Sequence, residues 1–274
     1  GIGVAVEPGD VVITAGGSEA ITFAMQVILD EGDEILIPEP FYPNYNTFIS
    51  VTGAEIKPIP TTPEEGYHFA QKERIEALIT PKTRAIMFTN PGNPTGVVLS
   101  QEECDTIAQI AREHDLWIIA DEVYREFTYN GEPLRTMGSY EDIKDRVIII
   151  DSVSKRFSAC GARIGAVICR NKEFQAKLMK LLQARLCVPT VDQLASATLY
   201  DVDENYLKEV NVEYKKRRDT VHEALKKIPG LVFSEPEGAF YMMIKLPVEN
   251  AEDFLVWLLT EFNDNNETVM YAPD

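Results

Sequence analysis

Cysteine and histidine are scarce in this chain of 274 residues, which has four cysteines and three histidines. The cysteines form no CxxC pair and have no metal-ligand spacing with the histidines; they are Cys104, Cys160, Cys169 and Cys187. This pattern argues against a zinc site and against the disulfide framework of a small secreted domain. We therefore expect free thiols in a reducing, cytoplasmic environment.

Long hydrophobic runs and excess positive charge are missing as well. No apolar stretch approaches the ~18 residues that a membrane-spanning helix needs, and no signal-peptide pattern follows Gly1. The 26 basic side chains are outnumbered by 44 acidic ones, so the net charge is −18. Such a charge disfavours non-specific binding to nucleic acid or to anionic membranes. We expect neither partner, although a local basic pocket for a small anion remains compatible with this charge.

Apolar runs alternate with amphipathic segments over residues 1–190, and the 45% hydrophobic content suffices for a sizeable core. The pattern predicts strands at 10–14, 34–38, 85–89, 116–120, 147–151 and 164–168, and helices at 18–29, 101–112 and 172–185. Ser18 is a plausible first residue of its helix, and Ser100 with Glu103 has the form of a capping box. This alternation predicts a three-layer α/β/α fold with a mostly parallel sheet.

The rest of the chain has a different pattern. Residues 191–227 indicate one long helix, followed by strands at 231–233 and 239–244, a helix at 251–261 and the start of a strand at Val269. We predict a large α/β domain over 1–190, a connecting helix over 191–220 and part of a smaller α+β domain over 221–274.

Polar and small residues gather where the predicted strands end. In an open α/β sheet these ends converge on one crevice, where ligands bind. Taken singly, each feature has an ordinary explanation, such as a turn glycine, a helix cap or a surface lysine. The residues concerned are Gly16, Gly17, Ser18, Tyr42, Asn93, Asp121, Tyr124, Ser152, Ser154, Lys155 and Arg163.

Together these residues favour a planar, phosphate-bearing cofactor with a basic ring nitrogen. Pyridoxal 5'-phosphate has these properties, because it forms a Schiff base with a lysine and requires an acidic partner for its pyridinium nitrogen. Glycines at the start of a helix bind phosphate through backbone N–H groups, and arginine binds it through its planar guanidinium.

Several motifs, in this order, give the sequence a resemblance to the class I/II aminotransferases of fold type I. They are Thr14–Ala20, Pro40–Pro43, Asn90-Pro-Gly-Asn-Pro-Thr-Gly96, Asp121–Tyr124, Ser152-Val-Ser-Lys155 and Arg163-Ile-Gly165. The resemblance extends over essentially the whole chain and is strongest toward bacterial aspartate aminotransferases.

The resemblance implies a role for each site residue. Lys155 would hold the cofactor as a Schiff base and shuttle the proton between the substrate Cα and C4′ of the cofactor. Asp121 would pair with the ring nitrogen, Tyr124 and Asn93 would hold the ring 3-oxygen, and Tyr42 would stack on the ring. The phosphate would be held by Gly16, Gly17, Ser18, Ser152 or Ser154, and Arg163.

The implied reaction is transamination between an L-amino acid and a 2-oxo acid such as 2-oxoglutarate, in a homodimer. Aspartate or an aromatic amino acid is the expected donor, and Arg185 is a conceivable partner for a side-chain carboxylate. A C–S lyase on the same scaffold and a non-catalytic, aminotransferase-like regulatory domain remain open alternatives.

The family pattern also has elements that this sequence does not contain. The arginine for the substrate α-carboxylate would follow an Ala-Pro such as Ala272-Pro273, and N-terminal residues would cover the site. We therefore expect the sequence to be truncated at both ends, and the 274 residues alone to be a poor transaminase.

Overall fold

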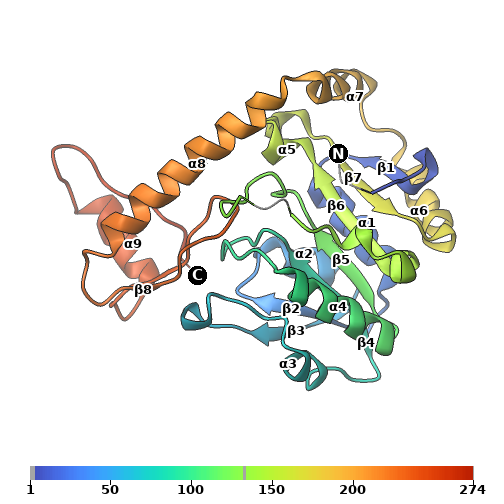
Figure 1. Cartoon of the computed structure of the whole chain (residues 1–274), viewed down its shortest axis with the longest axis horizontal. Helices are drawn as coiled ribbons and strands as arrows, with labels where there is room; N and C mark the ends of the chain where they lie inside the picture. The colour runs from blue at the N-terminus through green and yellow to red at the C-terminus, as the bar shows by residue number, and fades with distance from the viewer. Residues whose placement is uncertain (1–3, 132–133, 274) are drawn as a thin grey trace.

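The structure is a computed structural model that describes residues 4–131 and 134–273. A seven-stranded sheet is its centre, with the strand order β1-β7-β6-β5-β4-β2-β3 (Figure 1). Only β7 runs against the other strands, because it pairs antiparallel with both β1 and β6. The strands are β1 Val11–Thr14, β2 Glu34–Glu39, β3 Glu55–Pro60, β4 Thr83–Thr89, β5 Trp117–Asp121, β6 Val147–Ser152 and β7 Gly165–Cys169. The predicted, mostly parallel sheet is confirmed.

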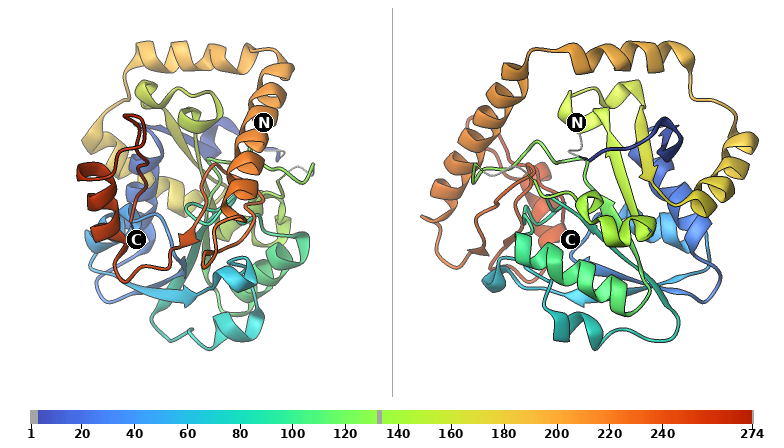
Figure 2. Two further views of the ribbon diagram at one scale, coloured as in Figure 1. Left: turned by 90° about the vertical axis from the view of Figure 1, so that its left-hand side faces the viewer. Right: turned by 45° about the vertical axis from the view of Figure 1, so that its right-hand side comes forward.

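Helices cover both faces of this sheet (Figures 1 and 2). On one face, Ile148 and Ile150 of β6 belong to the same core as α1, α2 and α6. On the other face, Val147 and Ile149 pack in a second core with α3 and α4. Both faces of each central strand are therefore buried, which explains why these strands are continuous apolar runs. The helices are α1 Gly17–Ile28, α2 Asn44–Ser50, α3 Lys72–Glu76, α4 Gln101–Glu113 and α6 Lys172–Arg185.

Two predicted helix starts have different outcomes. The capping box of α4 is present, since Ser100 Oγ accepts a hydrogen bond from the Glu103 N–H and the Glu103 carboxylate accepts one from the Ser100 N–H. For α1, the predicted start at Ser18 is wrong by one residue. The cap is Gly16, whose φ of 86° places it in a conformation that glycine adopts without steric cost.

The single helix predicted over 191–227 is wrong. The chain forms α7 Thr190–Ala197, a 3-10 turn over Thr198–Asp201, and then α8 Glu204–Leu225. Asp203 caps α8 by accepting a hydrogen bond from the Asn205 N–H at 2.8 Å. A short aspartate side chain that competes for backbone N–H groups favours a new helix start over a continuous helix. In Figures 1 and 2, α8 leads away from the sheet toward a second group of elements.

That second group contains β8 Val232–Phe233 and β9 Ile244–Lys245, which pair antiparallel, and α9 Ala251–Thr260. The strand predicted over 239–244 is mostly wrong, because only its last residue is in β9. Phe240 and Tyr241 lie instead in a loop and pack edge-on against Tyr124. No strand begins at Val269. The proposed domain boundaries stay a prediction.

Among the residues that the structure describes, no helix is long and apolar enough to cross a membrane. The four cysteines are free thiols, as expected.

Candidate active site

The polar residues singled out in the sequence lie at one edge of the sheet. Residues 16–18, 42, 93 and 155 follow β1, β2, β4 and β6, and Asp121 is the last residue of β5. The carboxyl ends of these strands share this edge. Arg163 lies at the same edge although it precedes a strand rather than following one. It precedes β7, and the start of an antiparallel strand lies beside the ends of its neighbours.

These residues line a single cavity of about 210 Å³. Of the predicted site residues, only Gly16 is not in direct contact with this space. Four further lining residues were not predicted: Ile21, Val123, Cys160 and Tyr241. A cavity with several convergent polar groups, at the carboxyl edge of an α/β sheet, is where small molecules bind in such folds.

The N-terminus of α1 and Arg163 form one side of the cavity. A Cβ atom at Gly16 would lie 2.2 Å from the Arg163 Nη2, so glycine is required for the guanidinium to approach. Arg163 is held by the carbonyl oxygens of Cys160 at 3.0 Å and Ala15 at 3.2 Å. The backbone N–H groups of Gly17 and Ser18 are at the positive end of the helix dipole. A phosphate-sized anion suits this combination of groups.

Lys155 lies on α5 Val153–Arg156, a single turn that follows β6 directly. Ser152 begins this turn, since its Oγ accepts a hydrogen bond from the Ser154 N–H at 3.1 Å. The Lys155 Nζ lies 5.7 Å from the centre of the Tyr124 ring. Lys155 lines the cavity, so its amino group lies where a ligand would meet it.

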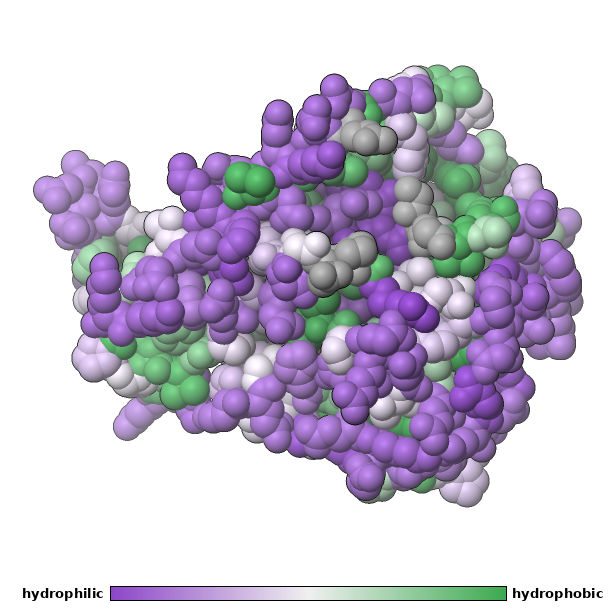
Figure 3. All heavy atoms as spheres, in the orientation of Figure 1, coloured by the Kyte–Doolittle hydropathy of each residue, from purple (hydrophilic) through white to green (hydrophobic). Residues whose placement is uncertain are grey.

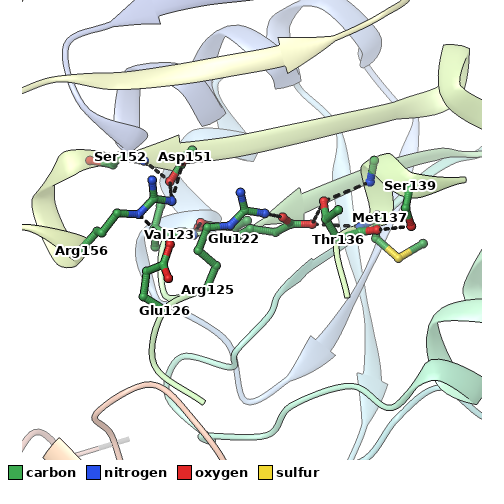
Figure 4. Close-up of polar contacts among 12 residues, drawn as sticks. Glu122, Val123, Arg125, Glu126, Thr136, Met137, Ser139, Asp151, Ser152 and Arg156 are labelled. Atoms are coloured by element: carbon green, nitrogen blue, oxygen red, sulfur yellow. Dashed lines mark hydrogen bonds and ion pairs between the residues drawn. The ribbon is translucent and has the colours of Figure 1, made fainter. Parts of the chain in front are cut away.

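A buried arginine, which the sequence did not single out, holds this turn in place. The Arg156 Nη2 donates to both oxygens of Asp151, at 3.3 and 3.0 Å, and its Nε lies 3.2 Å from the Glu126 Oε1 (Figure 4). Arg156 is 3% exposed. It therefore ties α5 both to the end of β6 and to the segment after β5. In the sequence, only its position next to Lys155 could have pointed to Arg156.

Glu122 follows Asp121 but faces away from the cavity. Its carboxylate pairs with Arg125 and accepts hydrogen bonds from the Thr136 hydroxyl and the Met137 N–H, both at 3.0 Å (Figure 4). Burial raises the pKa of Glu122 to about 7. Of these two adjacent carboxylates, only Asp121 can serve the cavity.

Asp121 is the acidic group of the site and is 5% exposed. Burial raises its pKa to about 6, although hydrogen bonds from the Tyr45 hydroxyl and the Val123 N–H act in the opposite direction. The Tyr45 Oη lies 2.7 Å from Oδ2, and the Val123 N–H donates to Oδ1 at 3.3 Å. A buried carboxylate of this kind gains most from a cationic ligand, which would restore its charged form.

A chain of hydroxyl and amide groups closes another side of the cavity. The Asn93 Nδ2 donates to the Tyr124 Oη at 3.3 Å, and the Tyr124 Oη lies 2.8 Å from the Tyr241 Oη. Burial and the contact with Tyr241 raise the pKa of Tyr124 far above its usual value, so this phenol is neutral. The structure thus brings Asn93 and Tyr124 together as expected. Tyr241, 117 residues further along the chain, was missed because its own segment carries no polar pattern.

Tyr42 and Arg185 have different positions relative to the cavity. Tyr42 lines it and packs edge-on against Tyr45, with ring centres 5.5 Å apart. Arg185 instead contacts α1 and β1: its Nε lies 3.2 Å from the Glu19 Oε1, and its Nη2 donates to the Ile13 carbonyl. Glu19 already compensates its charge, so the proposed role of Arg185 toward a substrate carboxylate finds no support.

The sequence matches the family model of the class I and II aminotransferases over residues 1–264. The chain therefore belongs to this family of pyridoxal-phosphate-dependent enzymes, and its sheet conforms to fold type I. Its relatives act on several donors. An aspartate aminotransferase from Musicola paradisiaca is 31% identical over 91% of this chain, and an arginine–pyruvate transaminase from Pseudomonas aeruginosa is 33% identical over 89%.

Among solved structures, an alanine aminotransferase from Pyrococcus furiosus superposes with a TM-score of 0.87 at 35% identity, over 94% of this chain. The chain spans 63% of the length of the Musicola enzyme, 62% of the Pseudomonas enzyme and 67% of the Pyrococcus chain.

Proposed function

We propose that this chain carries the cofactor-binding core of an aminotransferase that moves an amino group between an L-amino acid and a 2-oxo acid. The observation that supports this most strongly is the single cavity shared by the Lys155 amine, the buried Asp121 carboxylate and the anion-binding turn beside Arg163. These three groups match the aldehyde, the ring nitrogen and the phosphate of pyridoxal 5'-phosphate.

In this proposal each residue has a defined task. Lys155 holds the cofactor covalently through its amino group, and the N-terminus of α1 with Arg163 and Ser154 holds the phosphate. Tyr124 and Asn93 bind the ring oxygen, and Tyr42 covers a ring face. When bound, the cofactor supplies an electron-poor ring that stabilises negative charge at the substrate α-carbon.

The proton transfer is assigned to Lys155. Its neutral amine would act as a base close to the reacting carbon, and the same group could return the proton on the other side of the reaction. Asp121 remains ionised beside a cationic ring nitrogen, since an adjacent positive charge favours the carboxylate. Both roles need the two groups in one cavity, and electrostatic interactions of a buried group such as Asp121 are stronger than in water.

The amino donor is the least constrained part of the proposal. Relatives with 31 to 35% identity are named for aspartate, arginine and alanine, so similarity of this degree does not select one donor. We propose aspartate or an aromatic amino acid, with 2-oxoglutarate as acceptor, on the overall resemblance of the sequence.

Borohydride reduction after incubation with pyridoxal phosphate tests the cofactor assignment. We expect mass spectrometry to find the reduced adduct on Lys155 in the wild-type chain and to find none in Lys155→Ala. Lys180→Ala, on α6 outside the cavity, is the matched control and should keep the adduct. An unmodified Lys155, or an adduct spread over surface lysines, would refute the assignment.

A panel of amino donors with 2-oxoglutarate tests the reaction, and it requires the full-length protein as well as this chain. Production of glutamate with one donor class supports transamination and identifies the donor. A protein that binds the cofactor on Lys155 but turns over no donor would contradict the proposed activity and favour a regulatory domain.

A homodimer is proposed on the same resemblance and on the apolar surface of α7. Val191 and Leu194 are 77% and 67% exposed, and Asp192 is the only charged residue of this helix. Apolar surface is visible over α7 in Figure 3. Because two copies with a charge of −18 repel each other, a patch low in charge is where they can meet.

A further inference from the structure

Tyr45 lies beneath the cavity, on α2, and neither its sequence context nor the family motifs pointed to it. Its side chain is 1% exposed. The hydroxyl oxygen lies 2.7 Å from the Asp121 Oδ2 and 2.6 Å from the Thr89 Oγ1. Thr89 is the last residue of β4, and Asp121 is the last residue of the neighbouring β5, with which it is paired in register. Three adjacent elements thus place three polar groups in contact.

The direction of these hydrogen bonds follows from what each group can do. An ionised carboxylate only accepts, so Tyr45 must use its single proton toward Asp121. The Tyr45 oxygen then has lone pairs free, and the Thr89 hydroxyl can donate to it. The chain therefore runs from Thr89 through Tyr45 to Asp121, and it fixes both the rotation of the hydroxyl and the position of Oδ2.

The other groups around Asp121 do not replace this donor. The Val123 N–H reaches Oδ1 at the longer distance of 3.3 Å. Asp151 acts against ionisation of Asp121 and Lys155 favours it, but both effects are weaker than that of the Tyr45 hydrogen bond. Tyr124 is neutral. Removal of the Tyr45 hydroxyl would leave one oxygen of a buried carboxylate without its donor, which raises the energy of the charged form.

We propose that Tyr45 is a positioning residue for Asp121, and that its hydroxyl, oriented by Thr89, holds this carboxylate in the charged state that a cationic ring nitrogen requires. This inference rests on the proposed function for its consequence, because the ring nitrogen belongs to the proposed cofactor. The hydrogen-bonded chain itself belongs to the protein without ligand.

Tyr45→Phe is the direct test, since it removes one oxygen and keeps the buried ring. In the cofactor-free protein, carboxyl ¹³C NMR should show the pKa of Asp121 moved upward by about one unit, with the resonance assigned by its loss in Asp121→Asn. Equilibrium dialysis should then show pyridoxal phosphate binding about tenfold more weakly at neutral pH. Thr89→Val should change both quantities in the same direction by a smaller factor.

Tyr140→Phe is the matched control. Its hydroxyl also donates to a carboxylate, Asp105, at 2.6 Å, but on the surface of α4 and outside the cavity. We expect this variant to bind the cofactor within twofold of wild type. In an Asp121→Asn background, Tyr45→Phe should also change the affinity by less than about twofold, because the group through which it acts is gone.

Each outcome decides a different statement. An unchanged Asp121 pKa in a folded Tyr45→Phe protein overturns the inference, as does an equal loss of affinity with and without the Asp121 carboxylate. A wild-type protein that binds no pyridoxal phosphate overturns the proposed function instead. The NMR titration would then still decide the role of Tyr45 toward Asp121.

Discussion

At the scale of single residues, the site contains the buried carboxylate of Asp121, whose charged form is destabilised by burial in the cofactor-free protein. Asp121 is buried, and its pKa of about 6 lies above the 3.8 of an unperturbed aspartate. The native state therefore binds this proton more tightly than the unfolded chain does. The associated stability is present below about pH 4 and is lost as the pH rises toward 6 and above.

This sign leads to a prediction for Asp121→Asn. At pH 8 the variant should have a higher free energy of unfolding than the wild type, by on the order of 2–3 kcal/mol, because no buried charge remains. The difference should shrink toward zero near pH 4. Chemical denaturation of the cofactor-free proteins at several pH values measures it. Glu122 also titrates, but it is present in both proteins and cancels in the comparison. A difference in free energy of unfolding that does not change with pH would contradict the role assigned to Asp121.

Sequence motifs identified Asp121 but not the tyrosine that hydrogen-bonds to it. Asp121 itself was predictable, because an acidic residue directly after an apolar strand is easy to recognise. Tyr45 stands three residues after Tyr42 in a segment rich in aromatic residues, where a buried tyrosine is most simply explained as part of the hydrophobic core. Only its approach to Thr89 and Asp121, on two other elements, distinguishes it.

At the scale of elements, ion pairs of Arg156 hold the short helix α5, which carries Lys155, in position. With four residues, α5 is too short to be stable as an isolated helix. Arg156 connects it to Asp151 at the end of β6 and to Glu126 after β5 (Figure 4). The position of the reactive amine therefore depends on a buried ion pair beside it.

Arg156→Met should consequently be strongly destabilising. It keeps most of the side-chain volume but leaves Asp151 buried without its partner, which costs about 3–5 kcal/mol. Arg217→Met is the matched control, because Arg217 forms an exposed pair with Glu213 on α8 and should change stability by less than about 0.5 kcal/mol. Denaturant titrations of both variants give the comparison. Equal effects would mean that the buried pair has no special role.

The sequence pattern predicts the bounds of some helices better than those of others. The extent of α6 and the cap of α4 were predicted correctly, because local signals at their ends agree with their packing. The break between α7 and α8 was missed. The charged residues beyond 203 continue a helical pattern, and the decisive event is the capping of α8 by Asp203.

At the scale of the whole molecule, the exposed face of α7 predicts self-association. The chain should sediment at about twice its mass of 30.8 kDa. Leu194→Glu should shift the population toward monomer, since it places a charge within the apolar patch. Analytical ultracentrifugation at several concentrations measures this equilibrium. Val212→Glu, at a comparably exposed position on α8, should leave it unchanged. Equal effects of the two variants would argue against an interface at α7.

Most of the alternation of strands and helices over the first 190 residues follows from the sequence alone, although β3, α2 and α3 were not predicted. Strands that are buried on both faces must be continuous apolar runs, and the polar residues that end them must meet at one edge. The same logic identified Lys155, Asp121, Arg163 and the glycine turn, together with the cofactor they suit.

Contacts between distant segments depend on the tertiary structure. Tyr241 meets Tyr124 across 117 residues, and Arg156 links the ends of two strands. Tyr45 enters the site from beneath, through α2. Such side chains carry no periodic or local signal, because their partners are set by how the elements pack. Most of the polar groups that line the cavity were therefore visible in the sequence. Tyr241, and the groups that hold the others in position, became visible only in the folded chain.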